Sequence, residues 1–539
     1  MKKIIPLILL LSIFASLAVS SMLRKSGTAD EICHHIPSGY ILLTKGDFKM
    51  ATDSPPLARY IIAAPLKLFM RLNLPDDRSI WRVEDRAEFA RDFFFKYNNQ
   101  SKQMLLFSRL MIVLIGLLCG LLIFIWSNKL YGLKTALFAL FLYILSPNIL
   151  AHTRLATADM AVSFFILLSI YAFWRFYKNP NRPNLIIAGI CLGLAQLTKY
   201  SALILYPIFL ILFVFLRRKL SLKATLLIFL ISILMLWAGY GFNTEPLLED
   251  AMRQEEKIEL IDSKLETLLP VWNDSIKERV NHFLLKVPVP LGEHILGVLG
   301  VIRHSQIGHG TYFWGTHSGK GNILYFIVAF LIKTPIPLIA LLIMGIFVLI
   351  KKRLTADEYF LILPPAAFFF TALFSNIQIG LRHILPVYPF VFIIAARSLC
   401  LLRHRIIKVI IPVLCIWYII AFLSIQPDYL SYFNEFAGGP DNGWKILRDS
   451  NFGWGQDLPA LSDYMKREEI DEVVLNYSLC EDRPSVYGIK SRPIKQNELK
   501  RPGNRVYAIS PDSVTWSKEH EPTAKAGKSI FIYDFRDKR

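Results

Sequence analysis

The chain contains a series of long, almost uninterrupted apolar segments, and these constrain its fold more than any other feature. Met104 to Trp126, Ile323 to Ile350 and Ile406 to Ile425 are three examples. Each is long enough to cross about 30 Å of hydrocarbon as a helix. Because 54% of all residues are hydrophobic and only 19% are charged, the composition is also unusual for a soluble protein. We therefore expect an all-α polytopic membrane protein.

The positive charges indicate how these segments are threaded. The net charge is +19, but the cations lie in short clusters in alternate connections between apolar segments. This is the distribution of cytoplasmic loops, so we expect no nucleic-acid partner. With the clusters inside, about eleven spans thread consistently, with a cytoplasmic N-terminus and a C-terminal tail outside. The clusters are Lys129 with Lys134, Lys178 with Arg182, Arg217 to Lys223, Lys351 to Arg353, and Arg403 with Arg405.

The threading divides the chain into two domains. Residues 1–426 form the transmembrane domain, with large outer loops at 22–102 and 243–321. In the first loop, Pro55-Pro56 precedes Leu57 to Leu72, where apolar residues recur at helical spacing. We expect an amphipathic helix there, either in the membrane interface with its basic residues toward headgroups or packed under the outer domain.

Residues 427–539 are predicted to form a small α/β domain outside the membrane. A helix should end near Met465, and strands should cover Val473 to Tyr477, Arg505 to Ser510 and Ser529 to Tyr533.

The N-terminal segment and the cysteines leave alternatives open. The apolar run ending at Ser20 fits either a retained span or a cleavable signal peptide, and both place residue 30 outside. Cys33 and Cys480 would both lie outside and could form a disulfide. Four histidines between His294 and His317 lack a defined ligand spacing, so we expect no metal. The aromatic residues 312–314 could anchor their loop at the interface or border an acceptor groove.

Two adjacent carboxylates, Asp30 and Glu31, closely follow the first apolar segment. They are therefore held near the outer membrane surface, where a carboxylate can act as a general base. Loop carboxylates are commonly just solvated, and the residues alone leave both interpretations open. The neighbouring His34 and His35 do not indicate a metal, because consecutive side chains point apart on a regular backbone.

Ionisable residues also occur in short outer connections, where the charge distribution of membrane proteins disfavours cations. We infer that they converge on an anion at the depth of a lipid phosphate, for which arginine and lysine are the usual partners. They could instead reach toward headgroups or pair with the one carboxylate among them. The candidate residues are His152, Arg154, Asp159, Lys199, Arg382 and His383.

This combination suits sugar transfer from a polyprenyl phosphate. The leaving phosphate is already a good anion, so no general acid is needed. One base must accept the acceptor's proton, and fixed positive charge should stabilise the phosphate. Two closely opposed carboxylates, as in a hydrolytic glycosidase, are not evident.

Several motifs in order along nearly the whole chain resemble one family, the carrier-dependent membrane glycosyltransferases of the GT-C fold. This group contains the protein O-mannosyltransferases and the aminoarabinose transferase of lipid A. The motifs of the membrane part are Asp30-Glu31, Asp53 to Arg59, Ser146 to Asp159, Leu197 to Tyr200, Lys333-Thr334-Pro335, and Gly380 to His383 with Pro386 to Pro389. Those of the tail are Tyr432 to Glu435, Gly438 to Pro440, and Asp449 to Leu458.

The resemblance implies roles for particular residues. Asp30 would activate the acceptor as general base with Glu31 in support, in an inverting transfer that needs no obligatory metal or other cofactor. Relatives often carry His or Lys directly before the Pro-Pro pair, where this sequence has Ser54. Arg59 or the other outer cations would then supply the charge that binds the carrier phosphate.

The predicted function is therefore transfer of a sugar from a polyprenyl-phosphate donor to an extracytoplasmic protein, lipid or glycan, in a bacterial inner membrane. Mannosyl transfer to protein is one example within the resemblance. A polyprenyl-linked glycan ligase or polymerase is an alternative, and a lipid-linked sugar flippase or transporter is another. A transporter should place its charges near the bilayer midplane, whereas this chain concentrates them at one face.

Overall fold

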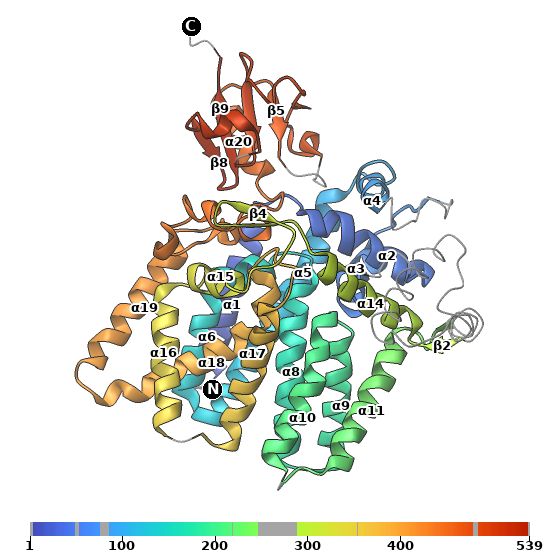
Figure 1. The fold of residues 1–539 in the computed structure, drawn as a ribbon, viewed down its shortest axis with the longest axis vertical. Coiled ribbons are helices and arrows are strands. Elements are labelled where there is room, and N and C mark those ends of the chain that lie inside the picture. Colours follow the sequence, from blue (N-terminus) through green and yellow to red (C-terminus); the bar gives the residue numbers. More distant parts are fainter. Residues whose placement is uncertain are drawn as a thin grey trace.

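The computed structural model describes residues 4–48, 53–75, 86–217, 219–245, 288–352, 354–477, 483–511 and 513–536. A large bundle of apolar helices carries a small sheet domain at one end (Figure 1). We call residues 458–536 the cap domain and the adjoining end of the bundle the cap side.

Many helices of the bundle are long and apolar enough to cross a bilayer. Six described segments meet this criterion, or eight if each of two bent helix pairs forms one span. The sequence predicted about eleven spans; α9 and two shorter apolar segments would bring the count to that number, but none of the three meets the criterion. The six segments are α1 (Ile4–Met22), α5 (Ser101–Tyr131), α8 (Ala158–Lys178), α11 (Leu222–Gly239), α17 (Ala356–Leu373), and η5 (Leu381–Val387) with α18 (Tyr388–Ala395) and η6 (Ala396–Arg403). The others are α9 (Arg182–Gln196), η4 (Tyr200–Ile204) with α10 (Leu205–Leu216), and α19 (Ile407–Leu423).

Proline explains the bend in each of the two bent pairs. α6 (Leu133–Ile144) meets α7 (Pro147–Thr153) at 65°, and α15 (Tyr325–Lys333) meets α16 (Ile336–Lys351) at 108°. Pro147 begins α7, and Pro335 directly precedes α16. Proline lacks the N–H that would continue a helix and disfavours helical geometry in the residue before it. The breaks therefore place polar backbone and side chains at helix ends inside the bundle.

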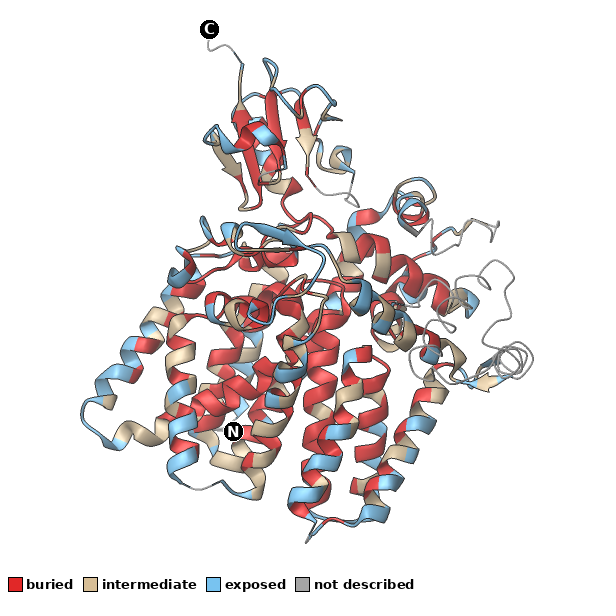
Figure 2. Ribbon diagram, in the orientation of Figure 1, coloured by how far each residue is buried: buried red, intermediate tan, exposed pale blue. Residues whose placement is uncertain are grey.

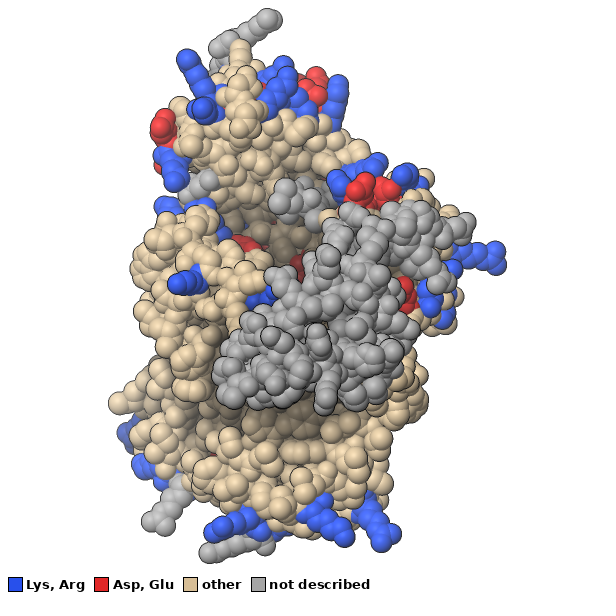
Figure 3. Space-filling model, turned by 45° about the vertical axis from the view of Figure 1, so that its right-hand side comes forward, with Lys and Arg blue, Asp and Glu red and all other residues tan. Residues whose placement is uncertain are grey.

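Burial and charge on the bundle agree with a membrane environment. The interior is buried, whereas large apolar side chains stay exposed along outward faces of α11, α16 and α19 (Figure 2). Lys and Arg side chains gather at the end opposite the cap domain and around the cap side, with an uncharged band between them (Figure 3). Exposed apolar surface of this extent is typical of proteins that contact lipid.

Short helices and strands cover the cap side. A single π-type turn, η1 (Glu31–His35), continues into α2 (Ile36–Lys45). The predicted helix after Pro55-Pro56 is α3 (Leu57–Phe69), which buries Ala58, Ile62 and Leu66 on one face and packs on α2 and α5. The other elements are α4 (Arg86–Phe95), β1 (Thr244–Glu245), β2 (Val289–Pro290), α14 (Gly292–Ile307), β3 (Thr311–Phe313) and β4 (Thr316–Ser318).

The cap domain has the predicted α/β character and a core of its own. Its helix α20 (Leu458–Arg467) and strands β5 (Val473–Asn476), β7 (Val506–Ile509) and β9 (Ile530–Asp534) correspond to the four elements expected from the sequence. The sheet order is β6-β5-β7-β9-β8; β5 is parallel to both neighbours and β9 is antiparallel to both. The additional elements are η11 (Pro484–Tyr487), β6 (Ser491–Pro493), η12 (Thr515–Lys518) and β8 (Ala524–Ala526).

Residues 427–457 join the cap domain to the bundle and pack with the bundle. Buried Tyr429, Phe433 and Leu447 of this segment belong to the same apolar core as the helices. The compact sheet domain therefore begins near Leu458, whereas the tail that precedes it covers the cap side. Its short turns are η7 (Tyr429–Ser431), η8 (Glu435–Ala437), η9 (Gly443–Lys445) and η10 (Asp449–Asn451).

Candidate active site

Asp30 and Arg382 form an ion pair on the cap side. Asp30 directly precedes η1, and Arg382 lies in η5, so two distant parts of the chain meet here. Arg382 Nη1 donates to Asp30 Oδ2 at 2.6 Å. The Asp30 side chain is 23% exposed, whereas that of Arg382 is 8% exposed. Burial would raise the pKa of Asp30, but Arg382, with His34 and His35, holds that pKa below its usual value.

Asp159 and Lys199 extend this pair into a network. Asp159 is in the first turn of α8, and Lys199 Nζ donates to its Oδ1 at 2.7 Å. Arg382 Nη1 lies 3.9 Å from Asp159 Oδ2. Asp30, Arg382, Asp159 and Lys199 thus alternate in charge, and we call them the substrate-side cluster. Only the two ends are appreciably accessible, since Lys199 is 23% and Asp159 2% exposed.

Two histidines border the substrate-side cluster. His152 is buried and lies close enough to Asp159 and Arg382 to interact electrostatically with both. His383 follows Arg382 and interacts with the same carboxylate. Among the described residues, His152 Nδ1 and His383 Nε2 have no hydrogen-bond partner. Both rings can therefore offer a polar nitrogen beside the network.

Glu31 has a different environment from its neighbour Asp30. Its carboxylate accepts two bonds from Arg109 (2.7 Å each), two from Thr28 (2.9 and 3.0 Å) and one from Ala156 N (2.7 Å). The side chain is fully buried. Burial would raise the pKa of Glu31, but Arg109 and these donors keep it low. Glu31 therefore holds the chain around Thr28, Arg109 and Ala156 together.

Arg154 and Arg59 lie outside the substrate-side cluster. Arg154 is fully buried, and none of its side-chain nitrogens has a hydrogen-bond partner among the described residues. Its electrostatic neighbours include Arg109 and Glu31 rather than Arg382. Arg59, also fully buried, pairs with Asp53 and donates to Ser54 O at 2.7 Å. Of the two arrangements left open for this helix, Arg59 therefore takes the packed one, because these acceptors hold it inside.

The tail contributes residues that sequence reasoning did not assign to the site. The ring of Trp454 lies 4.2 Å from Arg382 Cζ. Asp449 is exposed, interacts electrostatically with Arg382 and Asp30, and adopts a positive φ of 58°. The only sequence feature that points to Asp449 and Trp454 is the Asp449 to Leu458 motif of the tail.

The β3–β4 hairpin closes one side of this region. Tyr312 Oη donates to Lys445 O at 3.1 Å, and Trp314 N donates to Ile446 O at 2.9 Å. His309, at the start of the hairpin, interacts electrostatically with Asp449. Tyr312 therefore secures the hairpin to the tail, while Trp314 is 64% exposed. Figure 3 shows a hollow below the cap domain with acidic side chains inside it.

Fold comparison gives a match over nearly the whole length. The chain superposes on ArnT from Cupriavidus metallidurans, in its complex with undecaprenyl phosphate, over 97% of both chains with a TM-score of 0.51 and 12% identity. This chain has the GT-C fold. An oligosaccharyltransferase from Archaeoglobus fulgidus gives a TM-score of 0.46 and 14% identity, covering 92% of this chain and 65% of that one.

Sequence comparison agrees with the GT-C assignment over part of the chain. Residues 44–241 match the dolichyl-phosphate-mannose-protein mannosyltransferase family. An uncharacterized protein of Aquifex aeolicus is 29% identical over 152 residues, which are 27% of this chain and 30% of that protein. The resemblance inferred from sequence is thus confirmed for the GT-C fold, and the family match over residues 44–241 agrees with it.

The family match includes only two of the four residues of the substrate-side cluster. Residues 44–241 contain Asp159 and Lys199, whereas Asp30 and Arg382 lie outside that range. Within the described residues, no group of three or more His, Cys, Asp or Glu side chains is arranged to hold a metal. The predicted independence from metal and the predicted site roles stay predictions. Cys480 lies outside the described residues, so its pairing with Cys33 is likewise untested.

Proposed function

We propose that this GT-C protein is an inverting glycosyltransferase that moves a sugar from a polyprenyl-phosphate donor to an acceptor on the cap side. The observation that carries the proposal is the accessible Asp30 carboxylate, paired through one oxygen with a cation of a mixed-charge network. Two further carboxylates of this region, Asp159 and Glu31, are almost completely buried.

Asp30 serves as the general base. Its lowered pKa keeps the carboxylate ionised and ready to accept a hydrogen bond from an acceptor hydroxyl. As the hydroxyl oxygen bonds to the anomeric carbon, its proton passes to Asp30 Oδ1 or Oδ2. A donor phosphate that attracts Arg382 weakens the Asp30–Arg382 pair, so the basicity of Asp30 rises when the donor is in place.

Arg382 and Lys199 stabilise the leaving phosphate. The bond between the anomeric carbon and the phosphate oxygen breaks, and the polyprenyl phosphate leaves with the electron pair. Two cations near this oxygen lower the energy of the charge that develops on it. Asp30 and Lys199 occupy opposite ends of the substrate-side cluster.

The cap domain and the Asp30 site would lie outside the cytoplasm of a bacterial cell. On the face shown in Figure 3, Lys and Arg gather without Asp or Glu at the bundle end opposite the cap domain, whereas the cap side carries charges of both signs. Clusters of positive charge favour the cytoplasmic side. ArnT, which shares the fold, is described in complex with undecaprenyl phosphate, a lipid of the predicted donor class. The acceptor would then be a protein, lipid or glycan of the cell envelope.

Reconstitution of the full chain tests this function. The purified protein in lipid vesicles receives radiolabelled polyprenyl-phosphate hexoses together with a cell-envelope fraction, and the labelled product and released polyprenyl phosphate are measured. We expect transfer by the wild type and none by Asp30→Asn. Transfer only from diphosphate-linked oligosaccharides would favour a ligase or polymerase. Movement of the labelled lipid across the bilayer without transfer would favour a transporter.

A further inference from the structure

The segment Asp449 to Asp457 lies between the bundle and the cap domain and contacts Arg382 and the residues just before Asp30. We call it the tail segment. Its first half contacts η5 and its second half contacts the backbone that leads to Asp30. These contacts join residues that are far apart in the chain.

The first half of the tail segment holds Arg382. Asn451 Oδ1 accepts a hydrogen bond from Leu381 N at 2.9 Å, and Ser450 Oγ donates to Ile379 O. The Trp454 ring covers the guanidinium at 4.2 Å. Gly380 has a φ of +153°, and a Cβ there would collide with Ser450 Oγ. The tail segment therefore holds the start of η5 in two ways: it bonds to the backbone of Ile379 and Leu381, and its Trp454 ring packs on the Arg382 side chain.

Asn451 is fixed in turn by a buried ammonium group. Lys333 Nζ donates to Asn451 O at 2.5 Å and to Leu430 O at 2.8 Å, and the Phe433 ring lies 4.3 Å from it. Lys333 is 2% and Asn451 0% exposed. A buried charge is costly unless its donors are used. Here they tie the tail segment to the sharp bend between α15 and α16.

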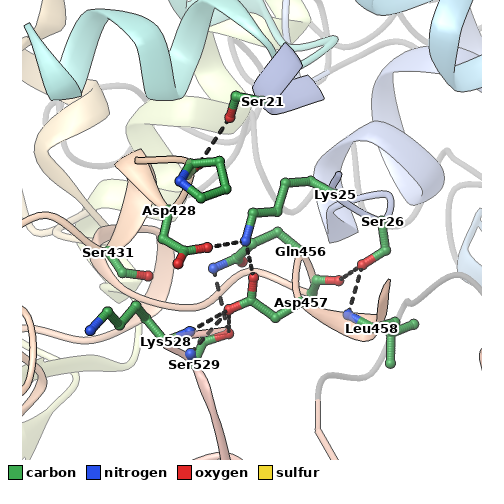
Figure 4. A network of polar contacts seen from close by, with 12 residues as sticks. Ser21, Lys25, Ser26, Asp428, Ser431, Gln456, Asp457, Leu458, Lys528 and Ser529 are labelled. Atoms are coloured by element: carbon green, nitrogen blue, oxygen red, sulfur yellow. Dashed lines mark hydrogen bonds and ion pairs between the residues drawn. The ribbon is translucent and has the colours of Figure 1, made fainter. Parts of the chain in front are cut away.

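The second half of the tail segment holds the residues just before Asp30. Ala29 N donates to Trp454 O at 3.2 Å, and Ser26 N donates to Gln456 O at 3.1 Å. Ser26 Oγ donates to Gly455 O at 2.7 Å and accepts from Leu458 N at 3.2 Å (Figure 4). Trp454 therefore contacts Arg382 through its ring and the neighbour of Asp30 through its carbonyl.

Asp457 connects these contacts to the cap domain. Its Oδ1 accepts from Lys25 Nζ at 2.6 Å, and Lys25 also pairs with Asp428 (Figure 4). Its Oδ2 accepts from Ser529 Oγ at 2.7 Å, Ser529 N at 3.0 Å and Lys528 N at 3.1 Å. Lys528 and Ser529 form the turn between β8 and β9. The buried Asp457 carboxylate thus joins the cap domain to the segment of chain, residues 25–30, that ends at Asp30.

We propose that the tail segment positions the Asp30–Arg382 pair for catalysis, and that the Lys25–Asp457 ion pair makes the position of Asp30 depend on the docked cap domain. The inference rests on the proposed function, because it assigns these residues to the same transfer reaction. They act through Asp30 and Arg382 and are positioning residues. A displacement of about 1 Å in catalytic groups can cost about 100-fold in rate.

The test compares Asp457→Asn and Trp454→Leu with the wild type in the reconstituted transfer assay. Asparagine keeps the size of Asp457 but loses the ion pair, and leucine removes the ring over Arg382. We expect kcat to fall about 10- to 100-fold in each, with KM for the polyprenyl-phosphate hexose changed less than about threefold. Trp454→Phe, which retains a ring, should recover most of the activity.

Glu498→Gln provides the matched control. Glu498 is a buried carboxylate of the cap domain that accepts from Arg492 at 2.6 and 2.7 Å and makes no contact with the tail segment that the structure records. Its substitution should lower the melting temperature of the protein while kcat stays near the wild-type value.

Two results would overturn the inference in distinguishable ways. Normal kcat in both Asp457→Asn and Trp454→Leu, with Asp30→Asn inactive, would reject the positioning role and leave the proposed function standing. Absence of transfer by the wild type would reject both. If Trp454→Leu does not fold, the outcome is judged from Asp457→Asn, with Trp454→Phe as its folded comparison. A loss of kcat in Glu498→Gln equal to that in Asp457→Asn would reject the positioning role, because it would show only a general loss of stability.

Discussion

The substrate-side cluster and the buried cluster around Glu31 begin at adjacent residues but differ in how completely their carboxylates are bonded. Asp30 has one hydrogen bond from Arg382 and remains partly accessible. Glu31 accepts five hydrogen bonds and is fully buried. A carboxylate with free lone pairs can accept a proton from a substrate, whereas one whose lone pairs are all used stabilises the fold. The comparison separates two roles that the sequence had assigned together.

The strongest prediction concerns the accessible carboxylate. Asp30→Asn should lower the transfer rate about 10²- to 10⁴-fold, the contribution typical of a general base, because asparagine cannot accept the acceptor's proton. Binding of polyprenyl phosphate, measured by equilibrium titration in detergent, should change less than about twofold. A variant that keeps wild-type turnover would exclude Asp30 as the base.

The adjacent glutamate should show the opposite result. Glu31→Gln removes the charge that compensates the buried Arg109 guanidinium, which should destabilise the fold by about 3–5 kcal/mol. Thermal unfolding of the purified protein measures this loss, and Asp30→Asn should unfold close to the wild-type temperature. If Glu31→Gln is instead stable but inactive, the two clusters do not divide the roles as described.

The cations predicted to bind the phosphate can be distinguished by how much each one contributes to polyprenyl-phosphate affinity. Lys199→Met should weaken polyprenyl-phosphate binding about 10-fold, since hydrogen bonds to charged groups contribute about 1.5–3 kcal/mol. Arg154→Met should leave that affinity nearly unchanged, because Arg154 lies with the Glu31 cluster. Isothermal titration with polyprenyl phosphate compares the two, and an equal loss of affinity would return Arg154 to the phosphate site.

The smallest expected effect is a shift in pH dependence. Asp30 must be ionised to act as base, and Arg382 holds its pKa below the usual value of 3.8. Burial raises the pKa of Asp30, and in Arg382→Gln the arginine that opposes this effect most strongly is lost. The pKa of Asp30 should therefore rise. The acid side of the pH–rate profile should therefore move to higher pH, measured relative to each protein's own maximum rate. An unmoved profile would mean that Asp30 does not control the acid side.

Much of the fold follows from local patterns in the sequence. Apolar segment length located the helices of the bundle, Pro55-Pro56 located α3, and short apolar runs rich in β-branched and aromatic residues located β5, β7 and β9. These features depend on neighbouring residues alone, so one sequence is sufficient to predict them. The bends at Pro147 and Pro335 also follow from local chemistry, although their angles depend on packing.

The site was predicted only in part because its contacts are distant in sequence. Asp30 and Arg382 are separated by 352 positions, and Lys25 and Asp457 by 432. Charge placement grouped Asp159, Lys199 and Arg382 correctly, since cations at the same membrane depth tend to meet the same anion. It could not show that Arg154 turns away or that Trp454 folds back over Arg382, because no local pattern encodes either contact.

The alternation of charge in the substrate-side cluster bears on selectivity among lipids. Arg382 and Lys199 each already have a carboxylate partner, so the site contains no unpaired cation of its own cluster to attract a passing phosphate. An ordinary phospholipid headgroup would have to break an ion pair before it could bind there. A donor that also places a sugar in the hollow below the cap domain gains contacts that offset this cost. Under the proposed function, other membrane phosphates would therefore compete less with the sugar-bearing carrier.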